Sequence, residues 1–148
     1  MKILVINGPN LNMLGRRETK HYGTDTLKSI ERALTEKGKA LGCGLVFFQS
    51  NHEGSIIDFI QEKASGADGI LINPGALTHY GYSLHDALVD SGLPVVEVHL
   101  SDIHTREKWR KISVISDVVI KQISGFKTQS YLLGLETLVE HIRGGKAK

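Results

Sequence analysis

Five short runs of apolar residues recur along the chain, and glycine or polar residues border each of them. The runs are continuous and rich in β-branched residues instead of alternating with polar positions. This pattern is typical of strands that are buried on both faces of a sheet. We therefore predict strands at residues 3–6, 45–48, 69–72, 95–98 and 118–123.

Segments with apolar residues at helical spacing separate these runs. Leu27, Ile30 and Leu34 form one such stripe, which is the pattern of a helix with one buried face. Ser55 is the predicted N-cap of the next helix, because Asp58 follows three residues later and completes a pattern similar to a capping box. Further stripes lie at residues 84–88, 105–112 and 132–142.

The alternation of strands and helices indicates repeated βαβ units. Such units build an open parallel sheet with right-handed crossovers and helices on both faces. We expect a flavodoxin-like three-layer α/β fold with a five-stranded parallel sheet in the order 2-1-3-4-5. The length of 148 residues fits one domain. We therefore expect residues 1–148 to form a single domain, with a long loop at about 8–24 and a frayed tail at 144–148.

Composition narrows the range of partners. The 18 basic and 16 acidic residues give a formal net charge of +2, which is too even to indicate a nucleic-acid or membrane surface. No apolar run approaches the ~18 residues of a membrane span, and the first apolar run is too short for a signal peptide. Cys43 is the single cysteine, which excludes an intramolecular disulfide and a cysteine-rich zinc site. We expect a cytoplasmic protein.

Polar side chains follow the predicted strands at the points where the strands end. His52, His79 and His99 all lie on this one predicted edge, where open parallel sheets bind ligands. A single loop histidine is more often solvated, but the joint pattern predicts a shared cleft. The turn that begins at Asn73 and Pro74 feeds a helix, so it suits a carboxylate or several hydroxyl groups. A purely structural turn is about equally supported.

The loop at 8–24 is long for a connection between a strand and a helix, and long loops are often lids. It places Arg16, Arg17, Lys20 and His21 close to Tyr22. An unperturbed tyrosine is ionised to only about one part in a thousand at pH 7. Neighbouring cations favour the ionised form, so a basic lid could make this tyrosine a general base. On the residues alone, an anchoring aromatic with solvated cations is at least as well supported.

Several common site motifs are missing from the sequence. There is no glycine-rich dinucleotide fingerprint, no P-loop and no nucleophile elbow. The histidines have no recognised metal-ligand spacing, although loop histidines can still meet around zinc. Two alternatives therefore stay open: a metal-dependent lyase or hydrolase that uses His79 and His99, and a flavodoxin-like binding module without enzymatic activity.

Four motifs follow one another along nearly the whole chain. They are Gly8-Pro9-Asn10-Leu11-Asn12 with Leu14-Gly15, Arg17-Glu18 and Tyr22-Gly23; Gln49-Ser50-Asn51-His52-Glu53-Gly54; Asn73-Pro74-Gly75 with Thr78-His79; and Glu97-Val98-His99-Leu100-Ser101 with His104, Arg106-Glu107 and Arg110. In this order and at this chain length, the sequence resembles the type II 3-dehydroquinate dehydratase family. The combination is specific, whereas any one motif alone is not.

The resemblance implies a lyase of the shikimate pathway, which leads to chorismate and the aromatic amino acids. Such enzymes convert 3-dehydroquinate to 3-dehydroshikimate and water by trans-elimination through an enolate, without a metal or cofactor. By this resemblance, Tyr22 is the base that takes the C2 proton and Arg17 keeps that tyrosine ionised. His99 is the acid that protonates the departing C1 hydroxyl group.

The resemblance also implies supporting roles for other positions. Asn12 would hold a water molecule that stabilises the enolate, and Glu97 would orient His99. Asp86 would reach the site of a neighbouring subunit within a homododecamer that is built as a tetramer of trimers. The remaining expected substrate contacts are Asn73, His79, Leu100, Ser101 and Arg110, with Leu100 and Ser101 contributing backbone N–H groups.

A few positions depart from the family pattern. Thr19 stands where the family often has proline, which affects the expected lid hinge, and His85 stands where it often has arginine. Asp102 and Trp109 replace a common asparagine and a common phenylalanine. The segment 125–131 diverges from the glycine-rich version of the family. None of these departures falls on the expected base, acid or activating arginine.

Overall fold

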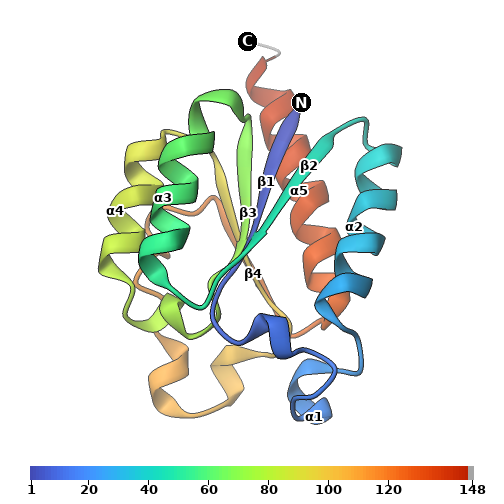
Figure 1. The fold of residues 1–148 in the computed structure, drawn as a ribbon, viewed down its shortest axis with the longest axis vertical. Coiled ribbons are helices and arrows are strands. Elements are labelled where there is room, and N and C mark those ends of the chain that lie inside the picture. Colours follow the sequence, from blue (N-terminus) through green and yellow to red (C-terminus); the bar gives the residue numbers. More distant parts are fainter. Residues whose placement is uncertain (147–148) are drawn as a thin grey trace.

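The computed structural model describes residues 1–146 and has an open five-stranded sheet at its centre (Figure 1). Every neighbouring pair of strands is parallel, and the order is β2-β1-β3-β4-β5. This confirms the predicted fold class and strand order. The strands are β1 (Lys2–Asn7), β2 (Gly44–Gln49), β3 (Gly69–Asn73), β4 (Val95–His99) and β5 (Lys121–Ser124).

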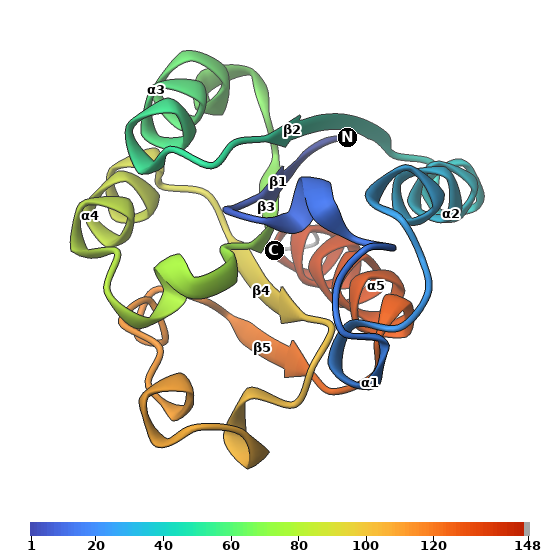
Figure 2. The same cartoon turned by 60° about the horizontal axis from the view of Figure 1, so that its bottom comes forward.

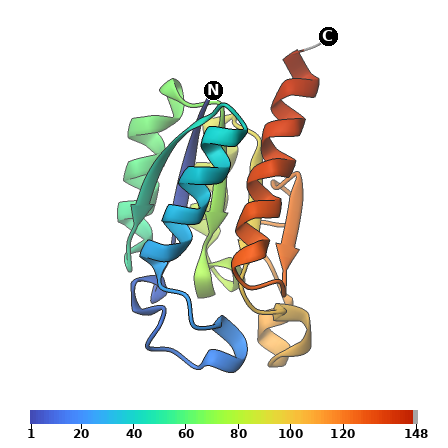
Figure 3. The same ribbon diagram turned by 90° about the vertical axis from the view of Figure 1, so that its right-hand side faces the viewer.

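Helices cover both faces of the sheet, as the alternating pattern predicts. The helices α2 (Leu27–Ala40) and α5 (Thr128–Lys146) lie side by side on one face (Figure 3). The helices α3 (Glu53–Lys63) and α4 (Tyr82–Ser91) lie on the other (Figure 2). Within residues 1–146, no helix is long and apolar enough to cross a membrane.

Each face of the sheet has its own apolar core because successive strand residues point to opposite faces. In β1, Ile3 and Val5 belong to the cluster under α2 and α5, whereas Leu4 and Ile6 belong to the cluster under α3 and α4. All four side chains are completely buried. Burial on both faces explains why the strands read as continuous apolar runs.

Helix α5 lies close against the sheet at Gly134. A Cβ atom at this position would lie 2.6 Å from Cγ1 of Val98 and 2.8 Å from Cδ1 of Leu71. Glycine has no side chain, so the helix backbone can approach β3 and β4 directly. This contact fixes the first turns of α5 beneath the carboxyl ends of the central strands.

Two predicted elements differ from the structure. The last strand begins at Lys121 instead of residue 118, because Val118 and Val119 pack against the apolar core before the chain joins the sheet. The helix predicted at 105–112 is instead two short 3-10 helices, η4 (Ile103–Thr105) and η5 (Lys108–Lys111).

The predicted helix boundaries also need correction. Helix α3 begins at Glu53 with His52 as its N-cap, so Ser55 lies inside the helix and caps nothing. The chain does contain a capping box, in which Thr26 and Ser29 cap α2 reciprocally. Helix α5 continues to Lys146, so residues 144–146 do not form the expected frayed tail. Residues 147 and 148 lie outside the described residues.

The long loop after β1 contains local structure. It includes the 3-10 helix η1 (Leu11–Met13) and the short helix α1 (Thr19–Tyr22). Gly23 ends α1 with a positive φ of 74°, which returns the chain toward α2. Tyr22 therefore lies at the end of a short helix, and its position is defined by local structure within the loop.

Candidate active site

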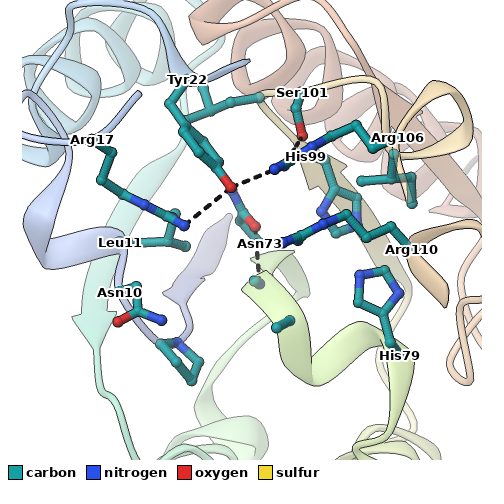
Figure 4. A pocket seen from close by; sticks show the side chains of 15 residues that line it. Asn10, Leu11, Arg17, Tyr22, Asn73, His79, His99, Ser101, Arg106 and Arg110 are labelled. Carbon is teal, nitrogen blue, oxygen red and sulfur yellow. Dashed lines mark hydrogen bonds between the residues drawn. The ribbon is translucent and has the colours of Figure 1, made fainter. Parts of the chain in front are cut away.

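A cavity of about 120 Å³ opens at the carboxyl ends of β1, β3 and β4 (Figure 4). This is the edge where the sequence predicts a shared cleft. The cavity is lined by the loop that carries α1, by the turn after β3 and by the segment after β4. The predicted site residues that line it are Arg17, Tyr22, Asn73, His79, His99, Leu100, Ser101 and Arg110.

Two arginines point at the phenolic oxygen of Tyr22. Nη2 of Arg17 donates a hydrogen bond to this oxygen over 3.0 Å, and Nη1 of Arg106 donates another over 2.9 Å. Cζ of Arg17 also lies 3.9 Å from the centre of the tyrosine ring. Cationic donors at this distance stabilise negative charge on the phenolic oxygen.

Arg106 is the main site residue that the sequence analysis missed. It also donates to Oγ of Ser101 over 3.3 Å, which ties the segment after β4 to Tyr22. Its only signal in the sequence is its place in the fourth motif, between His104 and Arg110. The sequence did not indicate that a residue 84 positions from Tyr22 would contact the phenolic oxygen.

His99 is held by a buried carboxylate. Nε2 of His99 lies 2.6 Å from Oε1 of Glu97, and both side chains are almost completely buried. Because a deprotonated carboxylate can only accept hydrogen bonds, Nε2 carries the proton of the neutral imidazole. The other ring nitrogen, Nδ1, is then the one that can exchange a proton with a bound molecule. A carboxylate in this position can orient the imidazole, which is the role expected for Glu97.

Three further donors surround the carboxylate of Glu97. The hydroxyl of Thr78 donates to Oε1, while the hydroxyl of Ser113 and the amide of Gln122 each donate to Oε2 over 3.0 Å. Burial opposes ionisation of Glu97, but the hydrogen bonds and the charge of His99 outweigh burial and lower its pKa. The group behind His99 is therefore an anion, and an anion stabilises a protonated imidazole.

His79 lines the cavity on the same side as Arg110 and across from Arg17 (Figure 4). Its Nδ1 donates to the carbonyl oxygen of Ile112 over 2.6 Å, and its ring meets the ring of Trp109 edge-on at 5.1 Å. Burial is the main cause that lowers the pKa of His79, with smaller opposing effects. A neutral His79 presents Nε2 as a hydrogen-bond acceptor, which suits a hydroxyl group of a ligand.

Arg110 carries positive charge to the mouth of the cavity (Figure 4). Its Nε donates to Oε2 of Glu107 over 2.6 Å, and its guanidinium group lies 4.1 Å from the ring centre of Trp109. These contacts hold the side chain while leaving other guanidinium donors available. A guanidinium group in this position suits a carboxylate ligand.

Asn73 lies at the carboxyl end of β3, where the chain turns through Pro74. The backbone N–H of Gly75 donates to Oδ1 of Asn73 over 3.1 Å, and the side chain is 3% exposed. Gly75 has a positive φ of 58°, and a Cβ atom there would lie 2.9 Å from the carbonyl oxygen of Pro9. The turn thus requires glycine and fixes the direction in which Asn73 faces.

The expected role of Asn12 needs correction. Asn12 is exposed on η1 and lines a separate surface hollow with Arg16 and Thr26. The asparagine of this motif that lines the cavity is Asn10, which adopts a left-handed conformation with φ of 69° and donates its backbone N–H to Oδ1 of Asn51. The left-handed residue followed by a 3-10 turn directs Asn12 away from the site, which the linear motif did not reveal.

Asp86 also lies outside the cavity of its own chain. It is on α4 with a side chain that is 81% exposed, and its carboxylate contacts His85 at 3.2 Å. His85 also contacts the carboxylate of Asp117 at 3.2 Å. Any contribution of Asp86 to a binding site therefore requires the site of another subunit.

The start of α5 holds the loop that carries Tyr22. Nζ of Lys127 donates to the carbonyl oxygen of Lys20 over 3.2 Å, and the hydroxyl of Thr128 donates to Oδ2 of Asp25 over 2.5 Å. Lys127 has a positive φ of 51°, which is uncommon for a residue with a side chain. The segment that diverges from the expected family pattern is thus the one that contacts this loop.

The described residues do not group into a metal site. Among residues 1–146, no three His, Cys, Asp or Glu side chains lie in an arrangement that could hold a metal ion. The cavity instead brings together a cation-flanked phenol and a carboxylate-backed imidazole. These are groups that can take a proton from one atom of a ligand and give a proton to another.

The fold and the cavity together define an α/β protein with an acid–base site at the carboxyl edge of its sheet. Residues 1–139 match the model of the family described as Dehydroquinase class II, and the chain belongs to this family. The 3-dehydroquinate dehydratase of Roseiflexus castenholzii is 55% identical over 139 residues, covering 94% of this chain and 88% of that protein.

Further comparisons agree with this assignment. The 3-dehydroquinate dehydratase of Halothermothrix orenii is 50% identical over 144 residues, covering 97% of both chains. The crystal structure of type II dehydroquinase from Butyrivibrio crossotus superimposes with a TM-score of 0.91 at 46% identity, covering 93% of this chain and 97% of that chain. The likeness therefore extends over the whole fold.

Proposed function

We propose that this protein is a 3-dehydroquinate dehydratase, a lyase that eliminates water from 3-dehydroquinate to give 3-dehydroshikimate. The observation that carries the proposal is the phenolic oxygen of Tyr22 between two guanidinium groups, in one cavity with the Glu97-backed His99. Membership of the dehydroquinase family and the names of the relatives agree with this chemistry.

Tyr22 is the base in this mechanism. Its phenolate takes the proton next to the ketone, and the electron pair of the broken C–H bond forms an enolate. Arg17 and Arg106 stabilise the phenolate before the transfer and negative charge near it during the transfer. A proton transfer by a positioned group accelerates a reaction by ~10²–10⁴-fold.

His99 is the acid. Collapse of the enolate breaks the bond between carbon and the departing hydroxyl group, and Nδ1 of the protonated His99 gives that group a proton, so that water leaves. The buried anion of Glu97 stabilises the protonated imidazole before this step. Proton exchange with solvent then returns Tyr22 and His99 to their starting states, so the net change is loss of one water molecule.

The remaining cavity residues bind the substrate. Arg110 and the backbone N–H groups of Leu100 and Ser101 suit its carboxylate, and His79 and Asn73 suit its hydroxyl groups. Asn10 takes the place at the cavity wall that the sequence analysis expected for Asn12.

The proposal extends to assembly, pathway and location. We infer a homododecamer built as a tetramer of trimers, in which Asp86 reaches the cavity of a neighbouring subunit. The exposure of Asp86, Tyr82 and Val89 on α4 supports an interface there. A gel-filtration mass close to that of one chain would contradict it.

The family chemistry belongs to the shikimate pathway, and we propose a cytoplasmic location.

An ultraviolet assay for the conjugated enone product tests the activity. Wild-type protein should raise the absorbance with 3-dehydroquinate, and EDTA should leave the rate unchanged. Tyr22→Phe should abolish turnover while keeping the fold, as measured by circular dichroism. Loss of activity with EDTA would support the metal-dependent alternative that uses His79 and His99, and no absorbance change at high protein concentration would support a binding module.

A further inference from the structure

Three buried polar side chains form a hydrogen-bonded chain beneath the cavity. The hydroxyl of Tyr131, near the start of α5, donates to Oδ1 of Asn7 over 2.7 Å and accepts from Nδ2 of Asn73 over 2.9 Å. Asn7 and Asn73 are paired positions at the ends of β1 and β3. Tyr131 is fully buried, and the two asparagines are 1% and 3% exposed.

One backbone group determines the direction of both hydrogen bonds that link Asn7, Tyr131 and Asn73. The N–H of Gly75 can only donate, so the atom of Asn73 that faces it over 3.1 Å must be the oxygen. Nδ2 of Asn73 therefore faces Tyr131, whose hydroxyl must accept. The hydroxyl's own hydrogen is then directed to Oδ1 of Asn7.

Tyr131 remains a neutral phenol in this environment. Complete burial is the largest cause that raises its pKa above the ordinary value, which the hydrogen bond from Asn73 only partly offsets. At the other end of this series of hydrogen-bonded side chains, Nδ2 of Asn7 has no hydrogen-bond partner within residues 1–146.

Within residues 1–146, these hydrogen bonds leave Asn73 with one donor hydrogen that no protein group accepts. An amide nitrogen carries two hydrogens, and Tyr131 takes one of them. Asn73 lines the cavity, so its second Nδ2 hydrogen is the group that it offers to a ligand (Figure 4). A rotated amide would place Nδ2 against the N–H of Gly75, and two donors would then face each other.

We propose that Tyr131 is a positioning residue that acts through Asn73. It holds the Asn73 amide with a hydrogen-bond donor toward the cavity, where it binds a hydroxyl oxygen of the substrate. Tyr131 itself does not line the cavity. This proposal rests on the proposed dehydratase function for its kinetic test, because Asn73 is a substrate contact only if that function holds.

A double-mutant cycle tests the kinetic part. Tyr131→Phe keeps the ring in the core and removes the hydroxyl, and kcat/KM for 3-dehydroquinate should fall roughly 3- to 10-fold, mainly through KM. In an Asn73→Ala background the same change should alter kcat/KM by less than about 2-fold, because the residue through which Tyr131 acts is gone. Thr35→Val, which removes an exposed hydroxyl on α2, should change neither constant.

Additive effects of Tyr131→Phe and Asn73→Ala would overturn the proposal, because a general loss of stability acts independently of Asn73. An unchanged KM in Tyr131→Phe beside a raised KM in Asn73→Ala would also overturn it. Crystal structures of the wild type and Tyr131→Phe give a test that needs no turnover. In the variant the Asn73 side chain should be displaced or disordered, because its Nδ2 loses the hydroxyl that accepts from it while the N–H of Gly75 still opposes rotation of the amide. An Asn73 held as in the wild type would count against the proposal even if the dehydratase function failed.

Discussion

The phenolic oxygen of Tyr22 lies 2.9 Å from Nη1 of Arg106, although 84 positions separate the two residues along the chain. Arg17, only five positions from Tyr22, completes the pair of cations at 3.0 Å. The base of the proposed reaction is thus assembled from two distant segments. The short-range partner was visible in the sequence, and the long-range partner was not.

Replacing Arg106 by alanine should slow the reaction. The change removes one charge-assisted hydrogen bond to Tyr22, and kcat/KM should fall about 10- to 100-fold. Steady-state kinetics with 3-dehydroquinate measure the effect. Arg16→Ala is the control because Arg16 is an exposed arginine in the loop that carries Tyr22 and lies outside the cavity. Equal rates for Arg106→Ala and the wild type would contradict the proposed activation of Tyr22.

Glu97→Gln should lower kcat, and it should also change how the free energy of unfolding depends on pH in the acid range. The amide removes the anion behind His99, and kcat should fall by roughly 10²-fold. The variant also places amide hydrogens among the donors on Thr78, Ser113 and Gln122, which costs about 1–3 kcal/mol of unfolding free energy.

The lowered pKa of Glu97 sets the sign of this stability effect with pH. A carboxyl group with a lowered folded-state pKa adds stability above its unfolded value of about 4.3, and this stability is lost as pH falls through the folded pKa. Urea unfolding across acid pH should therefore show a flatter profile for Glu97→Gln than for the wild type. Glu140→Gln, on the exposed face of α5, should keep the wild-type slope.

His85 should contribute stability that depends on pH in the opposite sense. Its hydrogen bonds to Asp117 and Asp86 raise its pKa, so its contribution is complete below the unfolded value of about 6.5. The contribution is lost as pH rises through the folded pKa. The melting temperature of His85→Gln should fall below that of the wild type at pH 6, and the difference should shrink as the pH is raised above 8. A difference that grows with pH would refute this assignment.

Gly134→Ala should destabilise the fold. The new methyl group would meet Val98 and Leu71 at less than 3 Å, and such overpacking costs typically 1–3 kcal/mol. Gly144→Ala in the same helix is the control, because no atom lies within 4 Å of its added Cβ. Alanine there should stabilise α5 by up to about 1 kcal/mol through helix propensity. Guanidinium unfolding separates the two effects.

The strand order and the helix positions were predictable because they depend on local periodicity and on general rules of connection. Ile3 and Leu4 are equally buried on opposite faces, which produces the continuous apolar run that indicates a parallel strand. The start of β5 was not predictable in the same way. Val118 is apolar because it packs against the core beside the sheet, and apolar character alone does not distinguish that role from pairing in the sheet.

The site was predictable where a residue follows directly from a strand end, as His99 does. It was not predictable where the backbone conformation decides the direction of a side chain. Asn10 and Asn12 are both asparagines of the same motif, and only the left-handed backbone at Asn10 determines which one reaches the cavity. Tyr131 was missed because it lies just before the predicted helical stripe at 132–142, and the sequence does not show that it is buried beneath the cavity.

The hydrogen bond from Gly75 to Asn73 is donated by the main chain, which limits how this part of the site can be altered. Gly75 has a positive φ and no room for a Cβ atom, so replacing it disturbs the turn before it can change the hydrogen bond. Substituting side chains one at a time would therefore leave this backbone donor in place, although it orients the amide of Asn73. The path of the backbone therefore decides which atom of the Asn73 amide faces Gly75, and reversing that orientation requires a rebuilt turn instead of a substitution at Gly75.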